Sequence, residues 1–307
     1  MNKRDFITIR SFTPAEIRKL LEDALDIKAN PSKYSESLKG KTLAMIFEKP
    51  SLRTRVTFDV GIHQLGGFSI YLSPAEISLG KRESVADIAR NLERMVQGIM
   101  ARTFSHRVVE ELAEHAHIPV INGLTDFNHP CQAIADYMTI LEIKKRLAGK
   151  KLAYVGDGNN VAVSLIKGAA RLGVHLAVAT PAGYEPNAEV VQWARSEGKD
   201  TGCRIDLTQD PVAAVKDADA VYTDVWTSMG QEAESALRLQ VFRPFQVDEA
   251  LFAHARPDAI FLHCLPAHRG EEVTHAVIES PRSVVFQQAE NRLHAQKAIM
   301  LTLMGQK

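Results

Sequence analysis

Short runs of Val, Ile and Leu alternate along most of this chain with longer segments whose apolar residues recur at helical spacing. Such alternation is typical of parallel α/β folds, in which each buried strand is followed by a helix that covers the sheet. The strands are expected at residues 42–47, 69–72, 98–101, 120–122, 152–155, 176–179, 220–223, 259–262 and 284–286. The pattern therefore predicts an α/β fold with central, mainly parallel sheets flanked by helices.

The predicted strands form two series, which divide the chain into two domains. At 307 residues the chain is long enough for two cores of ordinary size. A long amphipathic stretch at residues 130–147 joins the two series. We expect a first domain at 1–147, a second at 148–288, and a C-terminal helix at 289–307 that packs back on the first domain. The other helices are expected at residues 51–65, 84–96, 108–115, 161–172, 188–197 and 247–254, with one more starting at Thr13.

The charges of the chain balance, with 37 Lys and Arg residues against 37 Asp and Glu residues. Nothing in this balance indicates a nucleic acid or an anionic membrane as partner, although a local Arg cluster could bind an anionic small molecule. The three cysteines, Cys131, Cys203 and Cys264, are far apart and do not form a disulfide framework. No segment has membrane-spanning length, and the N-terminus lacks an apolar signal region. We therefore expect a cytoplasmic protein in a reducing compartment.

The chemically richest segment is KPSLRTR at residues 49–55, which follows an apolar strand and opens a helix. A helix N-terminus has unpaired backbone N–H groups and a positive dipole end, so it binds anions well. Ser51 and Thr54 add hydroxyl donors, and Arg53 adds a forked cation suited to phosphate oxygens. Taken alone, the segment fits a phosphate site and an ordinary capped helix equally well.

A second segment, FNHPCQ at residues 127–132, also opens a helix, because Pro130 suits the first turn. His129 then stands at the helix mouth and Gln132 one turn further on, on nearly the same face. A neutral imidazole could donate to a polarised carbonyl, while Gln132 offers both a donor and an acceptor. The simpler interpretation is a loop histidine and a surface glutamine.

Two further segments follow predicted strands of the second series, DVWTSMG at 224–230 and HCLP at 263–266. The carboxyl ends of parallel strands are where α/β proteins bind ligands. Asp224 could pair with an ammonium group, and Ser228 with the neighbouring backbone could hold a carboxylate. An acid that caps a turn and a buried inert Cys264 are the alternatives.

Two other interpretations of the sequence fail. The run VGDGNNV at 155–161 begins like a dinucleotide-binding fingerprint, but the third glycine of that fingerprint is missing and Gly168 lies too far on. His129 with Cys131, and His263 with Cys264, have no second ligand at a standard zinc spacing. We therefore expect neither a nucleotide cofactor nor a metal.

In their fixed order, the four segments SLRTR, HPCQ, DVWTSMG and HCLP resemble the ornithine carbamoyltransferase family. The similarity spans nearly the whole chain and includes LGKRES at 79–84, MARTF at 100–104 and ENR at 290–292. The first two segments are also similar to aspartate carbamoyltransferases, whereas SMG and HCLP favour ornithine as the acceptor. The family implies transfer of a carbamoyl group from carbamoyl phosphate to ornithine, in arginine metabolism, without a cofactor. It also implies a trimer with active sites between subunits and closure of the two domains on substrate.

The resemblance implies a role for each matching residue. Carbamoyl phosphate would be bound by Ser51, Leu52 through its backbone, Arg53, Thr54, Arg102, His129, Gln132 and Arg292, with the backbone of Cys264 and Leu265. Ornithine would be bound by Asn160, Asp224, Ser228 and Met229. The catalytic residues would be Arg102, His129, Asp224 and Cys264.

The chain departs from the family pattern at Ser78, where many relatives have Gln or His at a position that reaches a neighbouring subunit's phosphate site. Leu52 also replaces a Ser or Thr, which matters little if that position acts through its N–H group. The rival interpretations are a carbamoyltransferase for putrescine, N-acetylornithine or aspartate, a nicotinamide-dependent oxidoreductase, and a catalytically silent binding protein. The sequence leaves open whether the chain serves arginine synthesis or breakdown.

Overall fold

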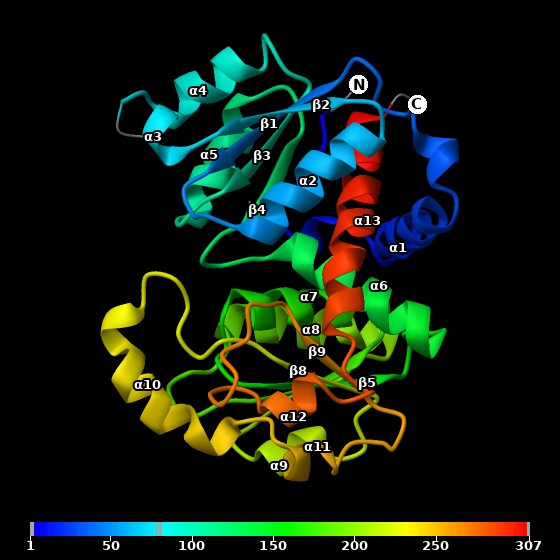
Figure 1. Ribbon diagram of the computed structural model, residues 1–307, viewed down its shortest axis with the longest axis vertical. Helices are drawn as coiled ribbons and strands as arrows, with labels where there is room; N and C mark the ends of the chain where they lie inside the picture. Colours follow the sequence, from blue (N-terminus) through cyan, green and yellow to red (C-terminus); the bar gives the residue numbers. More distant parts are fainter. Residues whose placement is uncertain (1–2, 78, 80–81, 306–307) are drawn as a thin grey trace. The chain divides into compact units, whose positions relative to one another are not determined.

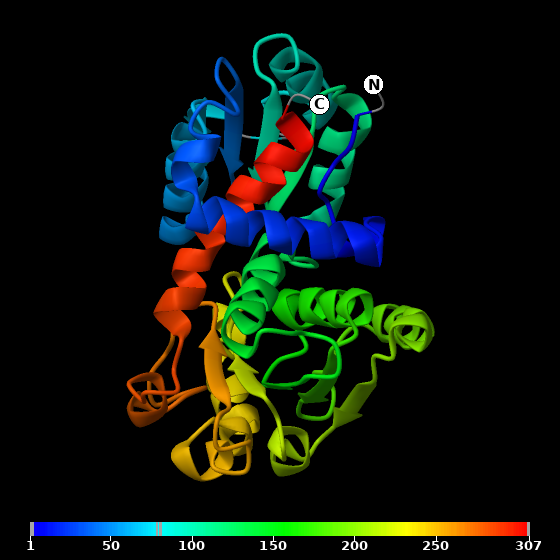
Figure 2. The ribbon, with the colours of Figure 1, turned by 90° about the vertical axis from the view of Figure 1, so that its right-hand side faces the viewer.

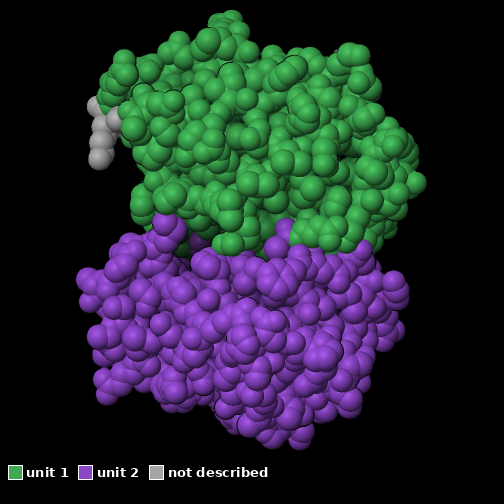
Figure 3. All heavy atoms as spheres, viewed as in Figure 1, with its two compact units in different colours: residues 1–138, 290–307 green, residues 139–289 purple. Residues whose placement is uncertain are grey.

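A computed structural model describes residues 3–77, 79 and 82–305. The chain divides into two compact units, coloured separately in Figure 3. Unit 1 comprises residues 1–138 and 290–307, and unit 2 comprises residues 139–289. Both boundaries fall inside helices, the first in α6 (Pro130–Lys144) and the second in α13 (Val285–Met304). Each unit contains one parallel sheet.

The sheet of unit 1 has four parallel strands in the order β2-β1-β3-β4 (Figure 1). They are β1 (Thr42–Phe47), β2 (Phe68–Leu72), β3 (Gly98–Arg102) and β4 (Val120–Leu124). The inner strands β1 and β3 are almost completely buried, as expected for continuous apolar runs covered on both faces. At the edge, β2 leaves Phe68 and Ile70 exposed. The chain runs from β1 outward to β2 and then crosses to β3, so the strand order reverses between β1 and β3.

The helices of unit 1 cover both faces of this sheet. They are α1 (Pro14–Ala29), α2 (Leu52–Gln64), α3 (Pro74–Ile77), α4 (Val85–Leu92), α5 (His106–His115), the first part of α6 and most of α13, with 3₁₀ turns at Ile9–Ser11 and Pro31–Tyr34. Helices α4 and α5 bury Val85, Ile88, Val109 and Leu112 in one apolar cluster with the sheet. Figure 2 shows α1 crossing α13, where Lys28 Nζ donates to Asn291 Oδ1 at 2.8 Å.

Helices α2 and α13 approach each other closely because α2 carries a glycine at the contact. A Cβ atom added to Gly61 would lie 3.1 Å from the Met300 side chain and 3.3 Å from that of Lys297. Contacts of this length are tighter than nine in ten real Cβ contacts, so the side chains of Met300 and Lys297 would have to shift by a few tenths of an ångström to accommodate a larger residue. The close packing matters for the site, because α13 carries Arg292 and α2 begins with the SLRTR segment.

The sheet of unit 2 has five parallel strands in the order β7-β6-β5-β8-β9. They are β5 (Lys151–Val155), β6 (His175–Ala179), β7 (Ile205–Thr208), β8 (Ala220–Thr223) and β9 (Ile260–His263). The strand order reverses between β5 and β8. The helices are α7 (Asn160–Leu172), α8 (Ala188–Thr201), α9 (Pro211–Val215), α10 (Ser235–Phe242), α11 (Glu249–Phe252), α12 (His275–Ile278) and the start of α13, with 3₁₀ turns at Glu232–Glu234 and Arg243–Phe245. The predicted fold class is therefore confirmed.

One predicted strand is wrong. Residues 284–286 belong largely to α13, which begins at Val285. The apolar run does touch the sheet, since Val284 N–H donates to Phe261 O at 3.0 Å and Ser283 forms an isolated bridge with Phe261. The mostly polar residues that follow at 287–291 do not continue an alternating strand pattern, and the segment is helical.

The short edge strand β7 and the helices α9 and α10 are additions to the predicted elements. Strand β7 is only four residues long and has two apolar residues, which is too short for a period to be recognised. Within the part of the chain that the structure describes, no helix is both long and apolar enough to cross a membrane.

Candidate active site

Several of the predicted site residues follow the strands between which the strand order reverses. In unit 1, the SLRTR segment follows β1 and Arg102 ends β3, the two strands between which the order changes. In unit 2, Asn160 follows β5 and Asp224 follows β8, again on either side of the change. The loops after two such strands leave the sheet in opposite directions and open a crevice at its carboxyl edge, where α/β proteins bind ligands.

The N-terminus of α2 is built around Ser51 and Thr54. Ser51 is the N-cap residue, and its Oγ accepts from Thr54 N–H at 3.2 Å. The two hydroxyl oxygens are also hydrogen-bonded to each other at 3.1 Å. Leu52, the first residue of the helix, is 74% exposed, so its side chain contributes nothing to this cap. The first turn therefore presents backbone N–H groups and two hydroxyls in one place.

Two guanidinium groups from distant parts of unit 1 converge on Thr54. Arg102 Nη1 donates to Thr54 Oγ1 at 3.3 Å, and Arg292 Nη2 donates to the same oxygen at 2.8 Å. Arg102 and Arg292 are both buried, and Thr54 is completely so. Two buried cations beside a helix N-terminus favour a polyanionic ligand, because burial of such charges is costly unless a counter-charge is bound.

His129 lies in the same electropositive surroundings. Burial lowers the pKa of His129 well below its ordinary value of 6.5, and the charges of Arg292, Arg102 and Arg53 lower it further. The imidazole is therefore neutral at physiological pH, as the sequence suggested. A neutral imidazole can donate one hydrogen bond to an oxygen on which negative charge develops.

Gln132 differs in one respect from the expectation that it offers both a donor and an acceptor. Its Nε2 already donates to Asp136 Oδ1 at 2.8 Å. Its Oε1 is buried and has no hydrogen-bond partner among residues 3–77, 79 and 82–305. The amide of Gln132 is thus oriented to accept, which suits a ligand N–H group.

In unit 2, Asp224 lies between two side chains from different loops. Its Oδ1 accepts from Cys264 Sγ at 2.9 Å, and its Oδ2 accepts from Asn159 Nδ2 at 2.8 Å. Asn159 is the N-cap of α7, so Asn160 occupies the first helical position. The structure therefore brings Asp224 and Cys264 together, as the sequence predicted, and adds Asn159, which the sequence analysis missed.

The loop that carries Cys264 is stabilised by a buried contact between His263 and Glu272. His263 Nε2 lies 3.1 Å from Glu272 Oε1, and both side chains are fully buried. His263 Nδ1 accepts from Leu265 N–H at 2.8 Å. Because this N–H is already used, Leu265 could contact a ligand nitrogen only through its carbonyl oxygen. Glu272 was missed because its sequence context carries no motif.

Potential ligand atoms of Asp224, His263 and Cys264 lie within 4.8 Å of one another. This proximity is not visible in the sequence spacing. Both ring nitrogens of His263 are engaged, however, one by Leu265 N–H and the other by Glu272. Asp224 and Cys264 are hydrogen-bonded to each other, and His263 has no ring nitrogen left to bind a metal.

Ser228 and Met229 lie on the loop between β8 and α10. Ser228 N–H donates to Gln231 Oε1 at 3.0 Å, and Met229 is 44% exposed. The base of this loop is anchored by Arg238, another residue that sequence reasoning missed. Its Nη1 donates both to Asp157 Oδ2 and to Trp226 O, each at 2.9 Å. The contacts of Ser228 and Met229 lie within their own loop, and their predicted contact with ornithine stays a prediction.

The glycines of the VGDGNNV turn serve the fold of unit 2. A Cβ atom on Gly158 would lie 2.3 Å from Pro186 N and 2.6 Å from Tyr184 O. The space beside this glycine is thus filled by the backbone of the chain itself. A dinucleotide-binding turn keeps that space for the pyrophosphate of its cofactor, so the geometry disfavours the oxidoreductase interpretation.

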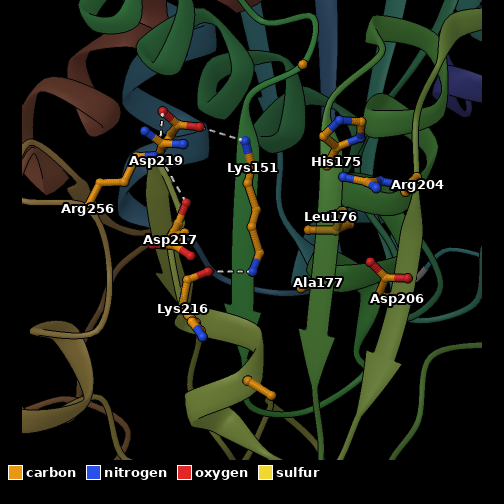
Figure 4. A pocket seen from close by; sticks show the side chains of 12 residues that line it. Lys151, His175, Leu176, Ala177, Arg204, Asp206, Lys216, Asp217, Asp219 and Arg256 are labelled. Carbon is orange, nitrogen blue, oxygen red and sulfur yellow. Dashed lines mark hydrogen bonds and ion pairs between the residues drawn. The ribbon is translucent and has the colours of Figure 1, made fainter.

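A cavity of about 510 Å³ lies in unit 2, at the amino-terminal ends of β5, β6 and β7. This is the sheet edge opposite the one that carries Asp224 and Cys264. Its labelled lining residues in Figure 4 are Lys151, His175, Leu176, Ala177, Arg204, Asp206, Lys216, Asp217, Asp219 and Arg256. None of the predicted site residues is among them, so this cavity is separate from the candidate site.

The predicted site residues thus fall into two groups, one in each unit. Those in unit 1 are Ser51, Leu52, Arg53, Thr54, Arg102, His129, Gln132 and Arg292, and those in unit 2 are Asn160, Asp224, Ser228, Met229, Cys264 and Leu265. Ser78, the departure from the family pattern, lies outside the described residues.

Comparisons with known proteins give a family model for each half of the chain. Residues 4–142 match the family model of the carbamoyl-P binding domain of aspartate/ornithine carbamoyltransferases. Residues 148–303 match the model of their Asp/Orn binding domain. The second match runs into α13, most of which lies in unit 1.

Curated relatives and solved structures are similar over the whole length. The ornithine carbamoyltransferase of Thermococcus kodakarensis is 57% identical over 98% of this chain and 96% of its own. The structure of the Pyrococcus furiosus enzyme has a TM-score of 0.95 and 54% identity over 98% of this chain and 97% of its own. The structure of the Giardia lamblia enzyme has a TM-score of 0.91 and 38% identity over 100% of both chains. The chain therefore belongs to the aspartate/ornithine carbamoyltransferase family.

Proposed function

We propose that the chain transfers the carbamoyl group of carbamoyl phosphate to the δ-amine of L-ornithine, which gives L-citrulline and phosphate. The observation that carries this proposal is the convergence of Arg102 and Arg292 on Thr54 at the N-terminus of α2. It is matched in unit 2 by the contact between Asp224 and Cys264 at 2.9 Å, in the segments that favour ornithine as the acceptor. The curated relatives, which are named ornithine carbamoyltransferases, support the same acceptor.

In this proposal the phosphate of carbamoyl phosphate binds at the first turn of α2. Ser51, the backbone of Leu52, Arg53 and Thr54 supply the donors, and Arg102 adds a guanidinium. Ser51 and Thr54 are hydrogen-bonded to each other at 3.1 Å, so their hydroxyls are already gathered at one point. Little reorganisation is then needed when the anion binds, which favours tight binding.

The carbamoyl group is bound next to the phosphate. Gln132 Oε1 accepts from the carbamoyl nitrogen, which Arg292 and the backbone of Cys264 and Leu265 also surround. Arg102 and His129 donate to the carbamoyl oxygen. The lowered pKa of His129 keeps this donor neutral, so it does not add a further charge to a site that already contains three arginines.

Ornithine binds in unit 2. Asp224 and Cys264 contact the δ-amine, while Asn160, Ser228 and Met229 hold the amino-acid end. Asp224 disfavours aspartate as acceptor, because two carboxylates would meet. The domain at 1–147 would then bind carbamoyl phosphate and that at 148–288 ornithine, with the helix at 289–307 packed back on the first.

The chemistry is direct acyl transfer. The neutral δ-amine attacks the carbamoyl carbon, a C–N bond forms, and the electron pair of the carbonyl moves to its oxygen. When this oxyanion collapses, its electron pair re-forms the carbonyl bond and the bond from carbon to the phosphate oxygen breaks. Phosphate leaves with the electrons of that broken bond and can take the proton from the amine. Well-placed donors to such an oxyanion contribute about 3–4 kcal/mol each, which assigns Arg102 and His129 the largest catalytic effect.

Assembly into a homotrimer is part of the proposal. Leu52, Val56 and Val60 lie one turn apart on α2 and are exposed, as are Phe68 and Ile70 on the edge strand β2. Apolar side chains gathered over neighbouring elements mark an interface. The proposed trimer would cover them and bring the active sites to the subunit interfaces. We further propose that the protein is cytoplasmic.

The test is an acceptor assay with carbamoyl phosphate and, side by side, ornithine, putrescine, N-acetylornithine and aspartate, with each product identified. Selective formation of citrulline supports the proposal. Turnover of another acceptor would keep the assignment of unit 1 and overturn that of unit 2. A folded protein without turnover would favour a silent binding protein, and a thermal shift with a nicotinamide nucleotide would favour the oxidoreductase.

A further inference from the structure

Asn159 directly precedes the predicted ornithine-binding residue Asn160. Its side chain is hydrogen-bonded to the first turn of α7 and to Asp224. Its Oδ1 accepts from the backbone N–H groups of Val161 at 2.9 Å and Ala162 at 3.2 Å. Its Nδ2 donates to Asp224 Oδ2 at 2.8 Å. One amide group therefore connects the N-terminus of α7 with the carboxylate after β8.

The orientation of this amide is determined by the helix. Backbone N–H groups can only donate, so the atom that faces Val161 and Ala162 must be the oxygen. The NH₂ group then necessarily points to Asp224. An Asp in place of Asn159 would cap the helix equally well but would have no hydrogen to donate.

The turn that carries Asn159 is itself held in place. Tyr154, which is completely buried, donates from its hydroxyl to Asp157 O at 2.8 Å and lies 3.3 Å from Asn159 Oδ1. Gly158 packs directly against the backbone of Tyr184 and Pro186. Because the turn that carries Asn159 and its capping oxygen are both fixed, the NH₂ group of Asn159 can determine the orientation of the Asp224 carboxylate.

We propose that Asn159 is a positioning residue, which holds Asp224 Oδ2 so that Oδ1 remains directed at Cys264 and at the ornithine amine. The inference rests on the proposed function, in which Asp224 contacts that amine. A carboxylate held at one oxygen cannot rotate freely, and loss of such alignment lowers reaction rate even when the charge is kept.

The decisive variant is Asn159→Asp, which preserves size and the capping oxygen but turns a carboxylate oxygen towards Asp224. We expect kcat/KM for ornithine to fall about 10- to 100-fold, the effect of losing a hydrogen bond to a charged group. Two facing carboxylates share a proton, so the acidic limb of the pH profile for ornithine should move to higher pH. The KM for carbamoyl phosphate should stay unchanged. The melting temperature should fall only at pH values at which both carboxylates are charged, because their repulsion destabilises the folded state.

A matched control exists at the next long helix. Asn187 is the N-cap of α8, and its side chain accepts from Val190 N–H at 3.1 Å. Asn187→Asp makes the same chemical change away from Asp224 and should leave both kinetics and pH profile unchanged. Asn159→Ser is a second variant, because serine still caps a helix but is too short to reach Asp224. It should lower kcat/KM for ornithine without the shift in pH profile.

The Asp224→Asn variant separates this inference from the proposed function. Full ornithine turnover by Asp224→Asn would overturn the role of Asp224 in the proposed function. A large loss in Asp224→Asn together with wild-type kinetics in Asn159→Asp and Asn159→Ser would overturn the positioning role alone. An equal loss of affinity for carbamoyl phosphate in the Asn159 variants would also overturn it, since that substrate is assigned to unit 1.

Discussion

Arg292 Nη2 donates a hydrogen bond of 2.8 Å to Thr54 Oγ1, although the two residues are 238 positions apart in the chain. The contact joins α13, near the end of the sequence, to the first turn of α2. It explains why the C-terminal helix belongs to the same compact unit as the first strands. Through Thr54 the predicted phosphate-binding turn depends on Arg292, a residue that follows the whole of unit 2 in the sequence.

The first prediction concerns Thr54→Val, which removes this shared acceptor with little change of volume. Arg102 and Arg292 would each lose a hydrogen bond, so we expect kcat/KM for carbamoyl phosphate to fall by about two orders of magnitude. The free energy of unfolding should fall by about 1–3 kcal/mol, because buried donors are left unsatisfied. Steady-state kinetics and urea denaturation measure both effects.

A control for this variant lies on the next turn of the same helix. The hydroxyl of Thr57 donates to the carbonyl oxygen of Arg53 at 2.6 Å and contacts neither arginine side chain in the described residues. Thr57→Val should leave kcat/KM for carbamoyl phosphate unchanged. If both variants lose activity equally, the convergence on Thr54 is not what binds the substrate.

The second prediction follows from the lowered pKa of His129. The folded protein keeps this imidazole neutral, whereas the unfolded chain takes up a proton as pH falls below about 6.5. His129 therefore contributes a loss of stability that grows as pH falls below about 6.5. In His129→Gln this part of the loss should disappear. Free energies of unfolding, measured by urea titration at pH 7.5 and pH 5, that fall equally in both proteins would contradict this prediction.

Much of the fold could be predicted because both sheets are parallel and buried, which gives continuous apolar runs such as 42–47 and 98–101. The error at 284–286 arose because an apolar run of three residues is too short to distinguish a strand from the start of a helix. Strand β7 was missed because it has no such run. As an edge strand of four residues, Ile205–Thr208 lacks the apolar run that marks the inner strands.

The site was predictable where chemistry is concentrated in short segments. Ser51, Thr54 and His129 stand at helix starts that caps and prolines reveal in the sequence. Asn159, Arg238 and Glu272 act by supporting other side chains across long sequence separations, and single positions of this kind leave no local pattern. Arg102 and Arg292 could be assigned only through the family resemblance, since nothing in their own surroundings in the sequence indicates that they meet.

The third prediction concerns Asp157, which pairs with Arg238 at the base of the loop that carries Ser228. Burial raises the pKa of Asp157 from 3.8 to about 6, although Arg238 opposes the shift. Because the folded state holds this proton more tightly than the unfolded state, stability is lost as pH rises from about 4 to about 6. The loss is about 2–3 kcal/mol and should be absent in Asp157→Asn. An unfolding free energy with the same pH dependence in both proteins would contradict it.

The last prediction tests the apolar surface formed by Leu52, Val56 and Val60 of α2 with Phe68 and Ile70 of β2. Val56 is 47% exposed, so a glutamate there is tolerated by an isolated chain but places a charge in the proposed interface. We expect Val56→Glu to elute as a smaller species than the wild type in size-exclusion chromatography with light scattering.

Val212, on α9 of unit 2, is a suitable control because it is 42% exposed and lies outside this surface. Val212→Glu adds the same charge and should keep the wild-type mass. Since the proposed active sites are completed at the interface, Val56→Glu should also lose citrulline formation while its circular dichroism spectrum stays native. A monomeric Val56→Glu protein with full activity would mean that one chain contains a complete site. A trimeric Val56→Glu protein would mean that α2 does not form the interface.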